Sequence, residues 1–206
     1  MNEYLKPEDI ENRSMEIIAS ELEQPLNPLL APIIMRVIHT TADFSYANTL
    51  EFSEGVIDIA LTALRQGVTL ISDTTMVKAG VDKTRLLALG NSIECFINDV
   101  DVAQTARNEG LTRSRIAIDK AVSLRKSLIF AIGNAPTALQ RICELNEVGL
   151  YRPELVIAVP VGFVNVVEAK ERLIHSGLPY IVSRGRKGGS NVAAAICNAL
   201  LRMALT

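Results

Sequence analysis

Residues 36–43 combine one of the chain's two histidines with polar and charged side chains at helical spacing. One side of a helix with 3.6 residues per turn would carry an apolar series: Leu30, Ile33, Ile34, Val37 and Ile38. The other side would carry Arg36, His39, Thr40 and Asp43. An imidazole, with a reference pKa of about 6.5, exchanges a proton near neutral pH. A guanidinium one turn earlier suits a carboxylate or a phosphate. The same spacing is also typical of a solvated helix face with an incidental histidine.

Length and composition limit the classes of protein. The chain has 206 residues and no linker rich in Pro and Ser, which predicts a single domain over residues 1–206. Nearly half of the residues (49%) are hydrophobic and only 4% are aromatic, so we expect a core of Ala, Val, Ile and Leu. A net charge of −2 argues against nucleic acid as the main partner, because such binding needs a large basic surface.

Cysteine usage and hydropathy point to a cytoplasmic protein. Cys95, Cys143 and Cys197 lie in apolar surroundings without the spacing of a zinc or redox motif, so we expect free thiols and no metal site. The N-terminus lacks an apolar signal region, and no segment offers the ~18 continuous apolar residues of a membrane span. A reducing cytoplasm, with no membrane partner, fits these features best.

The periodicity predicts an α/β fold. Helices are expected at 7–22, up to His39, 53–65, 101–109 and 113–125, and strands at 68–72 and 93–97. Three units of strand, small-residue loop and helix follow, with strands at 128–132, 155–159 and 180–183 and helices to about 146, at 165–175 and to 203. The strands are continuously apolar, which predicts a largely parallel sheet of about five strands with helices on both faces.

Ligands of open α/β sheets bind at the carboxyl ends of the strands, where helix N-termini carry partial positive charge. The loop of residues 185–190 is rich in cations, and Gly188, Gly189 and Ser190 suit an anion cradle before the last helix. A tight turn with solvated basic residues would explain the same sequence. The loop matches neither a Walker A motif nor a dinucleotide fingerprint. The uncharged loop 133–137 could likewise be ordinary turn chemistry.

Seven blocks along the chain resemble the precorrin-8X methylmutase family, also called cobalt-precorrin-8 methylmutase, of corrin biosynthesis. They are 11–14 (ENRS), 36–39 (RVIH), 73–80 (DTTMVKAG), 112–114 (TRS), 131–138 (AIGNAPTA), 160–164 (PVGFV) and 184–190 (RGRKGGS). Each block is short, but their order and spacing extend over nearly the whole chain.

The resemblance implies an isomerase that moves a methyl group from C11 to C12 of the macrocycle, giving hydrogenobyrinate or its cobalt-containing equivalent, cobyrinate. Such a shift is concerted and intramolecular, so it requires no cofactor, enzyme nucleophile or catalytic metal. The resemblance implies that His39 donates and accepts the proton. It makes Ser14 and Arg36 substrate contacts and Arg113 a further carboxylate clamp. Surface salt bridges for the arginines, and helix solvation for Ser14, are the alternatives.

Several points stay open at the level of sequence. The cradle at Gly188, Gly189 and Ser190 is inferred from its chemistry alone, and Asp73 and Lys78 could orient a ligand or close a loop. A nucleotide- or phosphate-binding α/β enzyme and a non-catalytic tetrapyrrole carrier are the other function classes. The resemblance implies a homodimer, and we expect the corrinoid near the subunit boundary, because so large a macrocycle is hard to bury in one domain of this size. Apolar residues on the 53–65 helix and the closing helix favour the same state.

Overall fold

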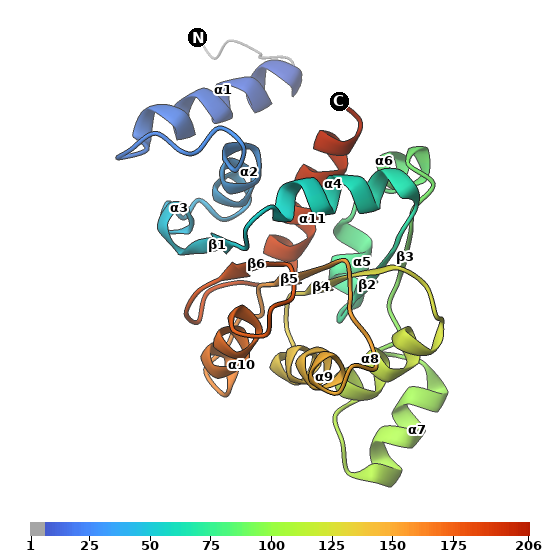
Figure 1. Cartoon of the computed structure of the whole chain (residues 1–206). Helices are drawn as coiled ribbons and strands as arrows, with labels where there is room; N and C mark the ends of the chain where they lie inside the picture. The colour runs from blue at the N-terminus through green and yellow to red at the C-terminus, as the bar shows by residue number, and fades with distance from the viewer. Residues whose placement is uncertain (1–6) are drawn as a thin grey trace.

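The computed structural model describes residues 7–206 and contains a six-stranded, mostly parallel sheet of order β1-β6-β5-β4-β2-β3 (Figure 1). The strands are β1 (Leu50–Phe52), β2 (Thr69–Ser72), β3 (Ser92–Glu94), β4 (Leu128–Ile132), β5 (Leu155–Ala158) and β6 (Tyr180–Ser183). Only β1 runs antiparallel, along β6. The predicted α/β class and parallel sheet are confirmed.

Helices cover both faces of the sheet, and the strands divide their side chains between two cores (Figure 1). One core lies under α1 (Pro7–Glu21), α2 (Ala31–Thr41), α3 (Tyr46–Thr49), α4 (Val56–Gln66), α5 (Thr75–Gly80), α6 (Lys83–Ala88) and α11 (Ser190–Ala204). The other lies under α8 (Arg113–Ser123), α9 (Pro136–Glu147) and α10 (Val166–Ile174), and α7 (Val100–Glu109) packs on α8. Along β4, Ile129 and Ala131 face the first core and Phe130 and Ile132 the second, as a pleated strand requires.

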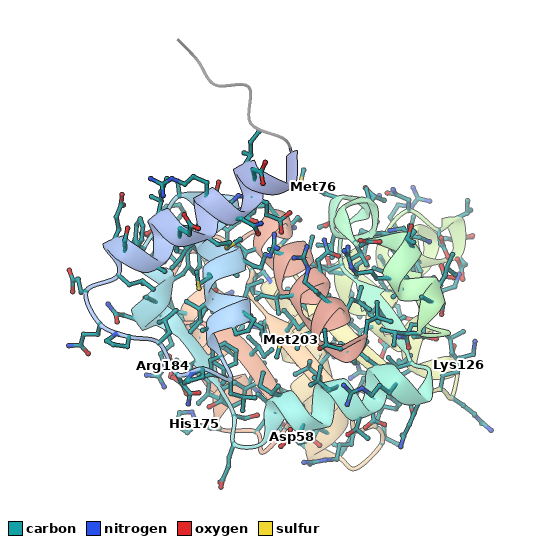
Figure 2. The ribbon with its side chains drawn as sticks, turned by 90° about the horizontal axis from the view of Figure 1, so that it is seen from above. Asp58, Met76, Lys126, His175, Arg184 and Met203 are labelled. Atoms are coloured by element: carbon teal, nitrogen blue, oxygen red, sulfur yellow. The ribbon has the colours of Figure 1, made fainter. Side chains whose placement is uncertain are left out.

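Helix α11 is the centre of the first layer. It contacts α2, α4 and α5, and in the view of Figure 2 it crosses the middle of this face with α2 and α4 beside it. Most of its apolar residues are buried within the chain. The apolar excess of the closing helix, which we expected to favour a dimer, is therefore already covered by the protein's own helices.

Other sequence predictions need correction. β1 was missed, because three residues of sequence Leu-Glu-Phe show no periodicity and the strand depends on pairing with β6. The strand predicted at 93–97 ends at Glu94, where pairing with β2 stops. The helix predicted at 53–65 begins only at Val56, and Gly67 ends it as expected, with a φ of 85°. The short helices α5 and α6 were also missed.

The described part of the chain contains no helix that is long and apolar enough to cross a membrane.

Candidate active site

The carboxyl ends of β2 and β4 meet around one buried carboxylate. Asp73, directly after β2, is only 4% exposed and accepts the backbone N–H groups of Gly133 (2.9 Å), Asn134 (2.8 Å) and Ala135 (2.7 Å). Burial raises the pKa of Asp73, and the three N–H donors oppose that rise. The amides of the 133–135 loop are thus already bound to an internal anion. Of the two roles predicted for Asp73, the contacts support loop closure.

The loop between β6 and α11 packs tightly against two neighbouring strand ends. The N–H of Gly189 donates to the Val159 carbonyl at 2.8 Å, and a Cβ on Gly188 would lie 2.1 Å from that same oxygen. Ser190 Oγ hydrogen-bonds Thr74 Oγ1 at 2.8 Å. The N-terminus of α11 has no side-chain cap. Within the predicted cradle, Gly189 is therefore buried and its N–H is already hydrogen-bonded. The backbone N–H groups in the first turn of α11 remain available to bind an anion.

His39 lies in the last turn of α2 with an exposed side chain. Within residues 7–206, its ring has no hydrogen-bond or ion-pair partner. A bridge four residues later connects the end of α2 to the loop before α11. Lys187 Nζ donates to Asp43 Oδ2 at 2.6 Å and to Ser45 Oγ at 2.9 Å, and this ammonium lowers the pKa of Asp43 to about 2. The bridge brings the predicted proton carrier and the predicted anion cradle to one side of the molecule.

Arg36 and Ser14 lie where α1 meets α2. Arg36 forms an ion pair with Glu11 of α1, and Arg202 of α11 binds the same carboxylate oxygen at 3.0 Å. These two guanidinium groups lower the pKa of Glu11. Ser14, one turn after Glu11, donates its hydroxyl to the carbonyl of Ile10 at 2.8 Å. Both predicted substrate contacts therefore already have partners within the chain.

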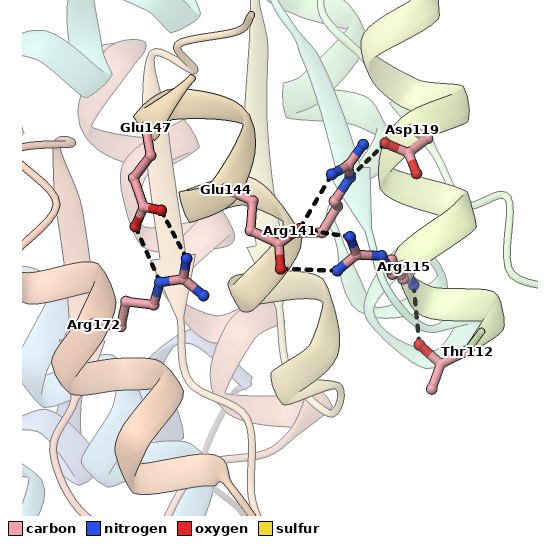
Figure 3. Close-up of polar contacts among 7 residues, drawn as sticks. All are labelled: Thr112, Arg115, Asp119, Arg141, Glu144, Glu147 and Arg172. Atoms are coloured by element: carbon pink, nitrogen blue, oxygen red, sulfur yellow. Dashed lines mark hydrogen bonds and ion pairs between the residues drawn. The ribbon is translucent and has the colours of Figure 1, made fainter. Parts of the chain in front are cut away.

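Arg113 stands apart from these residues, as the exposed first residue of α8. Thr112 caps this helix and also donates to Thr137 of α9 at 2.9 Å. Figure 3 shows how α8 is held: Arg115 binds both carboxylate oxygens of Glu144, which also pairs with Arg141. Arg113 borders a hollow of about 410 Å³ with α7 residues, including Arg107. Arg113 is thus an exposed cation at the start of a helix that other ion pairs hold in place.

Comparison with known proteins identifies the chain. The family model described as precorrin-8X methylmutase matches residues 9–203. A cobalt-precorrin-8 methylmutase of Salmonella typhimurium is 42% identical over 98% of this chain and 97% of the relative. A precorrin-8X methylmutase of Pseudomonas aeruginosa is 39% identical over 83% of each chain. The chain belongs to the precorrin-8X methylmutase family. It is an isomerase that transfers a methyl group within one molecule.

A solved structure agrees with this assignment. The crystal structure of a precorrin-8X methyl mutase from Thermus thermophilus has a TM-score of 0.87 and 37% sequence identity, and the match covers 95% of this chain and 97% of that one. Membership of a family of isomerases favours the methylmutase over the nucleotide-binding enzyme and the tetrapyrrole carrier.

Sequence reasoning missed several features of the candidate site. Lys78 does not end a strand, because it lies in α5 and pairs with Glu94 of β3 at 2.9 Å. The bridge from Lys187 to Asp43 was not predicted, because its two residues are far apart in the chain. Lys170 was also overlooked, although it shares the helical phase of the buried residues Val166, Ala169 and Leu173. A lysine among the apolar positions of a helix was the sequence feature that could have revealed it.

Proposed function

We propose that this methylmutase moves the methyl group of precorrin-8 or cobalt-precorrin-8 from C11 to C12, with His39 as proton donor and acceptor. The products would be hydrogenobyrinate and cobyrinate. The observation that carries the proposal is the exposed imidazole of His39 on α2, in a chain of this family, beside a loop joined to α2 by Lys187 and Asp43.

His39 would act by protonating the conjugated ring system. A proton on the macrocycle polarises it toward migration, and the same imidazole recovers the proton once the methyl group has moved. Migration is intramolecular, so the protein has to hold one ligand in the geometry of the shifted isomer. An imidazole that makes no hydrogen bond to the rest of the described chain is available for this proton transfer.

The periphery of the substrate explains the basic and polar residues. A corrinoid acid surrounds a flat apolar ring with acetate and propionate carboxylates, which arginine side chains and helix N-termini bind well. The substrate-binding residues we propose are Ser14, Arg36, Arg113, Gly188, Gly189 and Ser190. Gly189 shapes the backbone, because its N–H is already donated to Val159. The free donors at the start of α11 would receive a carboxylate.

Isotopic labelling tests the proposed reaction directly. Precorrin-8 with ¹³C in the migrating methyl group is incubated with the protein, and the product is examined by NMR and mass spectrometry. The proposal predicts unchanged mass, a new visible spectrum and a methyl carbon coupled to C12. A parallel reaction with cobalt-precorrin-8 shows which form is used faster. A product of altered mass, or a methyl group still on C11 with both substrates, would disprove the proposal.

A further inference from the structure

Lys170 of α10 is a fully buried lysine, with 0% of its surface exposed. Its ammonium donates to Ser183 Oγ at 3.2 Å, to the Gly185 carbonyl at 2.8 Å and to the Lys187 carbonyl at 2.9 Å. Within the described residues it forms no ion pair with a carboxylate. The buried ammonium therefore donates one hydrogen bond to the last residue of β6 and two to the loop between β6 and α11.

Such an arrangement is costly for the fold. A buried ammonium without a counter-ion has lost its hydration, and hydrogen bonds to neutral groups replace only part of it. Burial accordingly lowers the pKa of Lys170 to about 8. An apolar side chain of similar length would fill the same space in the core around Ala169 and Leu173. Packing therefore does not account for a lysine at this position.

The contacts of Lys170 fix the direction of the loop backbone. The carbonyls of Gly185 and Lys187 point inward to Lys170, and that of Arg186, between them, accepts the N–H of Gly162 at 3.1 Å. Ser183 Oγ also donates to the Lys187 carbonyl, at 2.9 Å. Three successive carbonyl oxygens are thus turned into the protein.

Turning the carbonyls inward leaves cations on the outer side of the loop. Arg184 pairs with Glu51, and the guanidinium of Arg186 lies 5.4 Å from the centre of the Phe163 ring. Lys187 reaches Asp43 beyond the end of α2. Inward carbonyls remove negative oxygen atoms from the surface that leads to the first turn of α11, where an anion would bind.

We propose that Lys170 is a positioning residue for the methylmutase. It holds residues 184–189 so that their outer surface accepts a substrate carboxylate and Lys187 stays bridged to Asp43, next to the helix that carries His39. The inference rests on the proposed function, since it assigns the loop to the carboxylates of the corrinoid. It differs from the role of His39, because Lys170 acts through the loop and touches no reacting atom.

The test replaces Lys170 by methionine and compares it with Lys83→Met. Lys83 is a suitable control because its ammonium also donates to backbone carbonyls, those of Lys78 and Val81, away from this loop. Affinity for hydrogenobyrinate is measured by spectroscopic titration. Loop order is measured by brief trypsin digestion, since Arg184, Arg186 and Lys187 are potential cleavage sites. Lys170→Met should bind the product roughly tenfold or more weakly, while kcat at saturation falls less than about threefold, because His39 is intact.

Trypsin should cut Lys170→Met within residues 184–187 and leave the wild type and Lys83→Met intact there. Unchanged affinity, an uncut loop, or equal losses in the Lys83→Met control would each overturn the inference. If Lys170→Met does not fold, Ser183→Ala decides, because it removes one donor to the Lys187 carbonyl and one acceptor of Lys170. It should weaken binding in the same direction and open the same loop. Failure of the labelled-substrate assay with wild-type protein would instead refute the proposed reaction.

Discussion

At the residue scale, Glu11 determines how much of the positive charge of Arg36 is available to a ligand. Its carboxylate binds both Arg36 and Arg202, so two permanent cations share one anion where α1, α2 and α11 meet. A surplus positive charge remains there, which suits a further carboxylate from a ligand. Loss of Arg36 would leave Glu11 paired with Arg202, so the fold should tolerate the change.

Arg36→Ala should therefore weaken binding of hydrogenobyrinate by about 1.5–3 kcal/mol, the usual range for a charge-assisted hydrogen bond. For a product whose peripheral carboxylates are amidated, the same substitution should reduce the affinity less, because this ligand offers no anion to the guanidinium. Titration of both ligands against the wild type and the variant measures the difference. Equal losses for the two ligands would show that Arg36 does not bind a carboxylate.

Asp73 should matter for stability more than for chemistry. In Asp73→Asn an amide NH₂ would face one or more of the backbone N–H donors of residues 133–135, so buried donors lose their acceptor. We expect the free energy of unfolding to fall by about 3 kcal/mol in urea titrations. Asp82→Asn is the control, because Asp82 accepts the Arg85 N–H at the exposed start of α6. Its cost should be much smaller, because asparagine caps a helix about as well as aspartate. Equal costs would contradict a special role for the Asp73 contacts.

At the scale of elements, the sequence was most informative where periodicity is strong. β4 and β6 begin and end where the apolar runs predicted them, and Pro136 starts α9 as expected. β1 was not predictable, because its pairing with β6 joins residues more than a hundred positions apart. The sequence revealed the cations of the 185–190 loop but not the Lys170 contacts that orient its backbone, because bonds from a helix side chain to loop carbonyls leave no periodic pattern in the sequence.

Burial of Lys170 also makes a prediction about pH. Its pKa in the folded state, about 8, lies below the value of 10.5 for an exposed lysine. Folding therefore releases a proton between these values, so the stability cost of the charged lysine is present below about pH 8 and disappears as the pH rises toward 10.5. Wild type should gain roughly 3 kcal/mol over Lys170→Met between pH 7 and pH 10.5. Parallel unfolding curves at four pH values measure this, and a constant difference would contradict it.

At the scale of the whole molecule, the homodimer stays a prediction with a revised physical basis. Helix α11 no longer supports it, because its apolar residues are covered within the chain. Helix α1 does: Ile10 and Ile17 are 52% and 43% exposed and lie seven residues apart on one side of the helix. A corrinoid is also large for one domain of this size, since ligand sites usually enclose most of the ligand surface.

We expect dilution to the monomer to reduce activity and corrinoid affinity together, and added hydrogenobyrinate to tighten the dimer, because a ligand that binds the dimer better shifts the equilibrium toward it. Sedimentation velocity across a dilution series, with and without product, measures both effects. Ile10→Ser with Ile17→Ser should shift the series toward monomer. A fully active monomer, with a monomer–dimer equilibrium that does not change when the product is added, would rule out a site shared between subunits.

The proposed role of His39 is tested by single-turnover methyl migration by His39→Ala, followed with the ¹³C-labelled substrate. His175→Ala is the matched control, because this second histidine is exposed at the end of α10 and its Nδ1 lies 2.8 Å from the Glu171 carbonyl. We expect His39→Ala to fold and to bind hydrogenobyrinate normally but to catalyse methyl migration roughly 10²-fold or more slowly. His175→Ala should match the wild type. Near-normal turnover by His39→Ala would contradict the mechanism.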